Sequence, residues 1–279
     1  MGRERGVKSK ELYPDIFSRH ALAYQQRLED VMARGESRGR VRAIALLSAR
    51  PGMRILDLAC GPGTMARVLA QQVEPGGQVV GVDLAPGMIE LARRSAPANA
   101  SFEVMDIEKL AFPDATFDAA VCGHGLQFVP HLLHALSEAR RVLREGGALA
   151  ASIPMAAVAE RVWALIDAVA DRLLAPAPSA ADASTTRATV SDPEALRAAA
   201  VEAGFATASV ESIEDKVVWQ SAEQLVSRFT GWWNGADRVG DLEPQARESF
   251  IEEAVAAVRR EHPGAITTVG RNLVLLARA

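Results

Sequence analysis

Short apolar runs alternate with stretches of helical periodicity through the middle of the chain. The apolar runs predict strands at residues 54–59, 78–83, 101–105, 117–123 and 147–153. The stretches between them repeat apolar positions every three or four residues and predict helices at 63–72, 86–94 and 130–143. Because this alternation is typical of βαβ units, we expect an α/β fold with a mostly parallel sheet and helices on both of its faces.

The pattern is less regular at the two ends of the chain. Residues 2–10 are polar and predict a frayed end, and the periodicity over 15–49 predicts at least two helices. Residues 175–186, rich in proline, alanine and serine, predict a mobile loop. Around that loop we expect helices at 156–174, 192–204, 222–233 and 244–261, and strands at 207–219 and 270–277.

Composition excludes several classes of partner. The 279 residues are 49% hydrophobic and 24% charged, as in an ordinary soluble globular protein. The 31 Lys and Arg residues against 35 Asp and Glu give a net charge of −4, so we expect no broad basic surface for nucleic acid or anionic lipid. Cys60 and Cys122 cannot build a disulfide framework, no apolar run is long enough to span a membrane, and the first ten residues do not resemble a secretory signal. We therefore expect a cytoplasmic protein.

A predicted strand that contains an acid runs directly into a glycine turn at Ile55–Thr64. Gly61 and Gly63 allow the backbone to turn tightly and a ligand to approach closely. Asp83 closes the next strand 22 residues after Gly61, where a carboxylate can accept hydrogen bonds from both hydroxyls of a ribose. The pattern predicts a nucleotide-binding turn, and it fits both NAD and other adenosine cofactors.

Asp57 helps to separate these two classes of cofactor. Its carboxylate, four residues before Gly61, would repel a pyrophosphate but suits a cationic ammonium or sulfonium group. A dinucleotide site also favours a third glycine, whereas residue 66 is alanine, which some dinucleotide folds tolerate. The third strand is followed by Asp106 and Ile107, an acid that can bind an adenine amino group and an apolar residue that can pack on the ring. These residues favour a sulfonium cofactor.

Four ordered motifs between about Met53 and Pro154 resemble those of the class I S-adenosylmethionine-dependent methyltransferases, specifically the small-molecule and quinone (type 11) group. The motifs are Leu56–Thr64, Val82–Arg93, Phe112–Asp118 and Arg141–Gly147, with weaker likeness at Asp192–Phe205 and Asn272–Ala277. The resemblance implies a Rossmann-like seven-stranded, mostly parallel sheet with an antiparallel last strand, helices on both faces and helical lid insertions. It also implies one structural domain in three parts: an N-terminal helical cap (1–50), an S-adenosylmethionine-binding core (51–154) and the rest of the sheet with substrate-lid insertions (155–279).

The resemblance implies S-adenosylmethionine as the cofactor and S-adenosylhomocysteine as its product. The cofactor-binding residues that it implies are Tyr24, Asp57, Ala59, Gly61, Gly63, Asp83, Leu84, Met88, Asp106, Ile107 and His124. The two glycines would contact the methionine end, with Asp57 near its ammonium group, and Asp83 would bind the ribose hydroxyls. His124 would form the floor of the sulfonium site, and Tyr24 lies on a helix that closes over the cofactor in this family.

Three sets of residues are candidates for further chemistry. His124 and His20 are candidate general bases, although alignment alone can drive methyl transfer from a sulfonium and His124 also fits a wall of the cofactor site. His131 and His134 stand three residues apart, but without a cysteine or carboxylate at ligand spacing we expect a solvated helix surface and no metal. The third set is Phe229, Trp232 and Trp233, which share one face of a predicted helix. This face belongs either to the core or, together with Trp163, to an apolar pocket that binds the acceptor.

The sequence therefore predicts an enzyme that transfers a methyl group from S-adenosylmethionine to an O, N or C nucleophile of an apolar small molecule, in specialised-metabolite biosynthesis. One alternative is a cyclase of the same fold that binds the cofactor without transferring its methyl group. A nicotinamide-dependent reductase is a weaker alternative. The chain departs from the family pattern at residues 155–190 and 231–270, so the acceptor stays open, as does assembly into a homo-oligomer.

Overall fold

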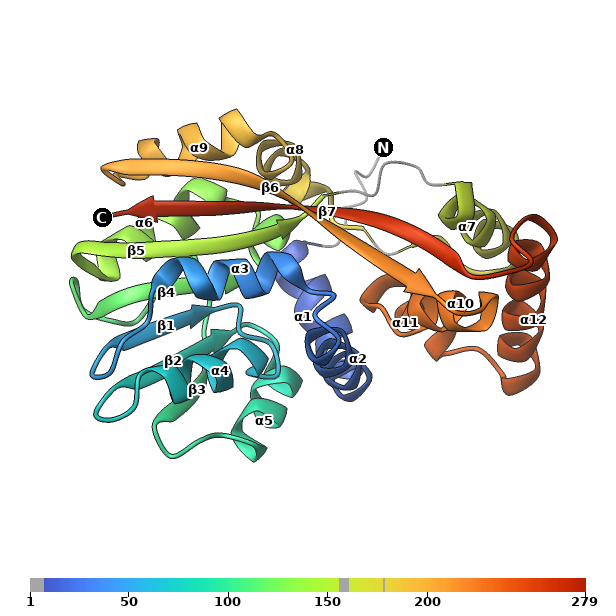
Figure 1. The fold of residues 1–279 in the computed structure, drawn as a ribbon, viewed down its shortest axis with the longest axis horizontal. Helices are drawn as coiled ribbons and strands as arrows, with labels where there is room; N and C mark the ends of the chain where they lie inside the picture. The colour runs from blue at the N-terminus through green and yellow to red at the C-terminus, as the bar shows by residue number, and fades with distance from the viewer. Residues whose placement is uncertain (1–7, 156–160, 178) are drawn as a thin grey trace, which may run out of the picture.

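The structure is a computed structural model that describes residues 8–155, 161–177 and 179–279, except for the side chains of residues 233 and 234. Its centre is a seven-stranded sheet with the order β3-β2-β1-β4-β5-β7-β6 (Figure 1). The strands are β1 (Arg54–Leu58), β2 (Gln78–Asp83), β3 (Ala100–Val104), β4 (Phe117–Gly123), β5 (Leu143–Pro154), β6 (Thr207–Trp219) and β7 (Ile266–Arg278).

Strands β1 to β5 pair in parallel, and β7 runs antiparallel to both of its neighbours, β5 and β6. The predicted Rossmann-like sheet, mostly parallel with an antiparallel last strand, is therefore confirmed. The chain builds the sheet outward from β1 in one direction through β2 and β3, and then in the other through β4 and β5. In open α/β sheets ligands bind beyond the carboxyl ends of the strands at such a reversal, which here falls between β1 and β4.

Helices cover both faces of the sheet, and two apolar clusters form the core between the layers. One face packs against α3 (Arg38–Leu47), α4 (Thr64–Gln72) and α5 (Pro86–Arg94). The other packs against α6 (Leu132–Val142), α8 (Ser184–Val190) and α9 (Pro193–Glu202). Successive residues of β1 alternate between the clusters, with Ile55 in the first and Leu56 in the second, and both are fully buried. An unbroken apolar run is what a strand between two helix layers requires.

A third apolar cluster lies beyond the end of the sheet. The paired strands β6 and β7 extend past the end of β5, because β5 pairs only with residues 272–278 of β7. Their outer ends carry four helices, seen on the right of Figure 1, which pack around the buried Trp219 and Phe250. These helices are α7 (Arg161–Leu173), α10 (Ala222–Thr230), α11 (Trp233–Gly240) and α12 (Pro244–Glu261).

The N-terminal helices α1 (Ser9–Arg19) and α2 (Ala21–Ala33) lie between the sheet and this outer cluster (Figure 1). The prediction of a frayed end over residues 2–10 is wrong from Ser9 onward, and residues 1–7 lie outside the described part. The backbone N–H of Ser9 donates a 3.0 Å hydrogen bond to Asp182, so the first turn of α1 is tied to a residue 173 positions away. Such a distant partner leaves no local signal in the sequence.

Two predicted boundaries in the C-terminal half are also wrong. The predicted loop 175–186 contains a short 3-10 helix from Ala181 and the start of α8, where Arg187 donates to the carbonyl of Ala180. The predicted helix 222–233 ends at Thr230, because Trp232 has an extended backbone (φ −96°, ψ 148°) and α11 begins after it. Phe229 and Trp232 therefore do not share a helix face. The predicted helix 156–174 is described from residue 161 onward.

Candidate functional site

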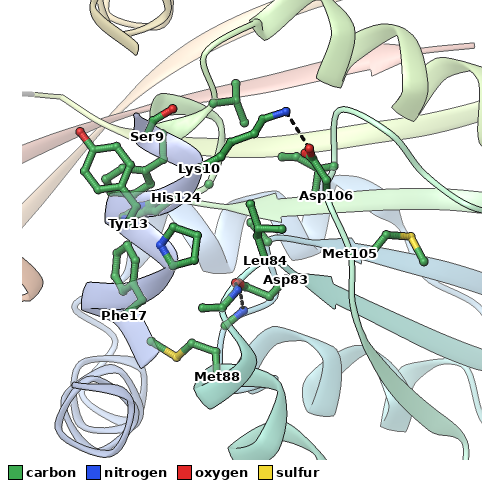
Figure 2. A pocket seen from close by; sticks show the side chains of 18 of the residues that line it. Ser9, Lys10, Tyr13, Phe17, Asp83, Leu84, Met88, Met105, Asp106 and His124 are labelled. Carbon is green, nitrogen blue, oxygen red and sulfur yellow. Dashed lines mark hydrogen bonds and ion pairs between the residues drawn. The ribbon is translucent and has the colours of Figure 1, made fainter. Parts of the chain in front are cut away.

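A cavity opens at the carboxyl ends of β1, β2 and β4, beside the reversal of strand order (Figure 2). Residues from the ends of all three strands, from the segment after β3 and from α1 line it. The structure brings together in this lining nine of the eleven residues that the sequence proposed for the cofactor: Tyr24, Ala59, Gly61, Asp83, Leu84, Met88, Asp106, Ile107 and His124. Asp57 and Gly63 lie outside the lining.

Asp83 connects the two turns that form one wall of the cavity. Its Oδ2 accepts a 2.8 Å hydrogen bond from the N–H of Gly61, and its Oδ1 accepts one of 2.8 Å from the N–H of Ala85. Burial raises the pKa of the Asp83 carboxyl, and these backbone donors oppose the rise because they favour the charged form. The side chain thus both faces the cavity and fixes the glycine turn.

Asp57 lies beneath the same turn rather than in the cavity. Its side chain is 1% exposed, and within the described residues neither carboxylate oxygen makes a hydrogen bond of ordinary geometry. Burial, reinforced by repulsion from Asp83, raises the pKa of Asp57 to about 8, while the Ala66 amide and Arg40 oppose the shift. Asp57 is therefore a buried carboxyl that has no counter-charge at ion-pair distance in the part of the chain that the structure describes.

The two glycines of the turn are needed for different reasons. Gly61 has a φ of +54°, and the nearest atom to a Cβ built there is Cε1 of Tyr24 at 4.0 Å, so that a side chain would project into the cavity. Gly63 has a φ of +76°, but a Cβ there would lie 2.8 Å from the ring of Phe102. Gly61 leaves room for a ligand, whereas Gly63 leaves room for the packing of β3.

We expect Gly63→Ala to lower the free energy of unfolding by about 1–3 kcal/mol more than Gly76→Ala does. Both positions have positive φ, so an alanine at either incurs the same kind of backbone strain. A Cβ at Gly76 meets no atom within 4 Å, however, while one at Gly63 meets Phe102. Chemical denaturation of the two variants measures the difference, and equal losses would contradict the packing role of Gly63.

Two residues of the lining that are not glycine adopt the left-handed conformation. Ala59 (φ 53°) follows β1 and His124 (φ 66°) follows β4, the two strands at the reversal. The turns touch, since a Cβ built at Gly125 would lie 2.4 Å from that of Ala59. Backbone strain of this kind concentrates at functional sites, and it is held here by the surrounding structure. The sequence carries no sign of it.

His124 lines the cavity directly after the end of β4. Its backbone N–H donates to the carbonyl of Ser152 at 2.9 Å, which fixes the turn. Burial and the nearby Arg40 and Arg228 hold the pKa of the imidazole well below its usual range, although Asn272 opposes the shift. Neither ring nitrogen makes a hydrogen bond of ordinary geometry to a described residue. The ring is therefore neutral at pH 7 and a weak base.

His20 is not in the cavity. Its Nε2 lies 3.5 Å from Oδ1 of Asp237, and its ring packs against Gly240 of α11. His131 and His134 lie at the start of α6 with ring centroids 5.1 Å apart. The described ranges contain no group of three His, Cys, Asp or Glu side chains that could hold a metal ion.

Helix α1 supplies a wall that the sequence analysis missed. Figure 2 shows Lys10 extending from α1 toward Asp106, and its Nζ lies 2.6 Å from both Asp106 and Glu108. The ring of Phe17 meets that of Tyr24 edge to face at 5.5 Å. The aromatic residues that recur along 13–24 were the sequence signal that could have indicated this wall. The α1 residues in the lining are Ser9, Lys10, Tyr13, Pro14 and Phe17.

A second cavity adjoins the first, and His124 lines both. Three of the predicted acceptor-pocket residues, Trp163, Phe229 and Trp232, line this second cavity. The side chain of Trp233 lies outside the described part. Trp232 also approaches Tyr24 of the first cavity, with ring centroids 5.6 Å apart. The two cavities thus meet at His124, with aromatic rings beside the junction.

A Rossmann-like sheet whose glycine turn and strand-end acids line a cavity defines an α/β protein built to hold a nucleotide-like cofactor. Within this class, residues 55–147 match the model of a family described as a methyltransferase domain. This segment contains all four sequence motifs and is therefore similar to a methyltransferase domain, so the resemblance that the motifs indicated is confirmed.

A relative named as a methyltransferase matches part of the chain, and two solved structures share its fold. The demethylmenaquinone methyltransferase of Symbiobacterium thermophilum is 35% identical over 147 residues, which cover 50% of this chain and 58% of that protein. The chain thus matches less than two thirds of the length of this relative. One chain of a complex containing the Haloferax volcanii Trm112 methyltransferase activator superposes with a TM-score of 0.56 at 19% identity, over 93% of this chain and 96% of its own. The 4+2 cyclase SpnF superposes with a TM-score of 0.50 at 21% identity, over 87% and 80% respectively. At these identities the two structures show the fold alone.

The described ranges contain no helix that is long and apolar enough to cross a membrane.

Proposed function

We propose that the first cavity binds S-adenosylmethionine and that the protein transfers its methyl group to a small molecule held in the second cavity. The observation that carries this proposal is the junction of the two cavities at His124, beside a glycine turn that belongs to a methyltransferase domain. Residues 1–50 would then cap the cofactor, 51–154 would bind it, and 155–279 would complete the sheet and hold the acceptor.

The residues of the first cavity fit this cofactor. The open space at Gly61 admits the methionine end, and the buried carboxyl of Asp57 beneath the turn can ionise on binding to suit its ammonium group. Asp83 can accept hydrogen bonds from the ribose hydroxyls, and Asp106 and Ile107 can contact the adenine. When bound, the cofactor supplies an electrophilic methyl group whose bonding electrons remain on the sulfur.

The protein's own part is to align the acceptor with that methyl group. Alignment of two reactants is worth about 7–11 kcal/mol in favourable cases. Because its pKa is lowered, His124 acts in this proposal as a wall that excludes water from the junction, and not as a strong base. The acceptor therefore brings a nucleophilic O, N or C atom that is already deprotonated or loses its proton after transfer.

Two further parts of the proposal concern the acceptor and the location. The relative from Symbiobacterium thermophilum is named for a quinone substrate, which supports a small cyclic acceptor here. We place this acceptor in specialised metabolism and the protein in the cytoplasm. Whatever the acceptor, the transfer converts the cofactor to S-adenosylhomocysteine.

Incubation with methyl-labelled S-adenosylmethionine and a metabolite extract of the producing organism tests the proposed transfer. We expect a labelled product and one S-adenosylhomocysteine released for each product formed. A product that forms without release of S-adenosylhomocysteine would instead identify a cyclase that retains its cofactor. A reaction that consumes NADPH and needs no S-adenosylmethionine would identify a reductase and contradict the proposal.

Cofactor binding at about pH 7 is expected to release close to one proton from Asp57. In the unliganded protein its pKa of about 8 keeps the carboxyl mostly protonated at this pH. A nearby ammonium group favours the ionised form, so the pKa falls on binding and the proton leaves. Above about pH 9 the carboxyl is already ionised, and the release should disappear.

Calorimetry in two buffers of different ionisation enthalpy measures this release. The matched control is Asp57→Asn, which keeps the shape of the side chain but cannot titrate. Undiminished proton release by Asp57→Asn at about pH 7 would show that the proton comes from another group.

A further inference from the structure

The second cavity carries arginines that have no carboxylate partner among the described residues. Arg40, which is 2% exposed, donates to the hydroxyls of Ser37 and Tyr24. Arg228 lines the same cavity, and Arg27 lies nearby, stacked on the same tryptophan, Trp219. Within the described residues, none of these three guanidinium groups has an Asp or Glu oxygen within 4.0 Å.

The acids that line this cavity are already engaged or lie at its exposed side. Glu36 accepts two hydrogen bonds from Arg34, at 2.9 and 3.0 Å. The two oxygens of Asp215 accept from the backbone N–H of Arg38 and from the side-chain amide of Asn272. Asp167 is exposed. Among the described residues, Arg40 and Arg228 therefore line the cavity without a carboxylate at ion-pair distance, although Glu36 and Asp215 attract Arg228 from further away. The aromatic residues of the cavity alone did not predict this feature.

Arg228 is the arginine best placed to meet a ligand. Its guanidinium carbon lies 5.6 Å from the centre of the Trp219 ring and 5.1 Å from that of Trp232. Stacking uses the faces of the guanidinium and leaves its N–H donors pointing outward in the plane. Burial, together with repulsion from Arg27 and Arg40, lowers the pKa of Arg228 to about 10, although Glu36 and Asp215 oppose the shift. An anion in contact would relieve this cost.

We propose that the acceptor carries a carboxylate, which pairs with the guanidinium of Arg228 in the second cavity. This inference rests on the proposed function and adds a charge requirement to the acceptor, which the sequence predicted to be apolar. A planar carboxylate matches the in-plane donors of arginine with two parallel hydrogen bonds. A doubly charged phosphate fits less well, because Glu36, Asp215 and Asp167 line the same space. The rings of Trp163, Phe229 and Trp232 would contact the apolar body of the acceptor.

Binding of 2-naphthoate and of its neutral analogue 2-naphthamide tests the proposal by calorimetry on the full chain. The two probes share one ring system and differ in charge. We expect the carboxylate to bind about ten- to a hundredfold more tightly than the amide. This ratio corresponds to the free energy of one hydrogen bond to a charged group. Arg228→Gln should abolish this preference, and Arg228→Lys should restore part of it because the charge remains without the planar fork.

The matched control is Arg271→Gln. Arg271 lines the same cavity, but its Nη2 lies 3.2 Å from Glu214, so its loss should leave the preference unchanged. Equal binding of the two probes, binding of neither, or a preference that survives in Arg228→Gln would overturn the proposal. Each titration is made with and without S-adenosylhomocysteine. Failure of S-adenosylhomocysteine to bind the unaltered protein contradicts the proposed function, whereas failure of the carboxylate preference contradicts this inference.

Discussion

Replacing Asp83 by alanine is expected to weaken S-adenosylmethionine binding at least about tenfold. A hydrogen bond to a charged group is worth about 1.5–3 kcal/mol, and Asp83 is proposed to accept such bonds from the ribose. The same carboxylate accepts from the backbone N–H groups of Gly61 and Ala85, each at 2.8 Å. The substitution therefore removes a ligand contact and loosens the turn that shapes the cavity. Calorimetry gives the change in affinity.

Two further variants separate these effects. Asp83→Asn keeps one oxygen acceptor and the shape of the side chain, so we expect a smaller loss than with alanine. Glu90→Ala is the control for the loss of an acid near the site, since Glu90 is exposed on α5 and pairs with Arg94. Affinity that is unchanged in Asp83→Ala would refute the ribose assignment.

Replacing Gly61 by alanine is expected to weaken cofactor binding by about ten- to a hundredfold. A methyl group at this position projects into the cavity, and inserting such a group where a ligand must fit costs about 1–3 kcal/mol. The left-handed φ of +54° adds backbone strain of about 1–2 kcal/mol, which appears as a loss of stability. Calorimetry and chemical denaturation measure the two effects separately.

Gly35→Ala is the matched control for the strain. Gly35 has a φ of +69°, and a Cβ there would meet no atom within 4 Å. It does not line either cavity. We expect both alanine variants to lose stability but only Gly61→Ala to lose affinity for S-adenosylmethionine. Equal affinities would mean that the cofactor does not approach the glycine turn.

The central sheet was predictable because its signals are local. A strand such as Val79–Val82 is apolar at every position and is bounded by turn residues, so its burial between two helix layers can be inferred from a few neighbouring residues. In this fold the glycine turn and the acids at 83 and 106 each lie at or just after the end of a parallel strand, so their separation along the sequence is set by the lengths of the strands and helices between them. Those acids therefore fall into one cavity, together with most of their proposed neighbours.

The rest of the site depends on contacts that are distant in sequence. Helix α1 enters the cavity wall because Asp182 holds Ser9, and no local pattern reveals that pairing. The interpretation of 229–233 as one helix face failed because the chain becomes extended at Trp232. The charge of the second cavity was hidden for a related reason. Arg40 and Arg228 are far apart in the sequence, and only the fold shows that no described carboxylate lies at ion-pair distance from either guanidinium group.

Calorimetric titration of the unaltered protein with S-adenosylmethionine and, separately, with NADPH tests the central claim most directly. Asp83 beside the glycine turn, and Asp57 beneath it, which a cationic ligand can ionise, should favour a cationic sulfonium cofactor over a pyrophosphate. We predict saturable binding of S-adenosylmethionine at one site per chain and no measurable binding of NADPH. Binding of NADPH without affinity for S-adenosylmethionine would contradict the account.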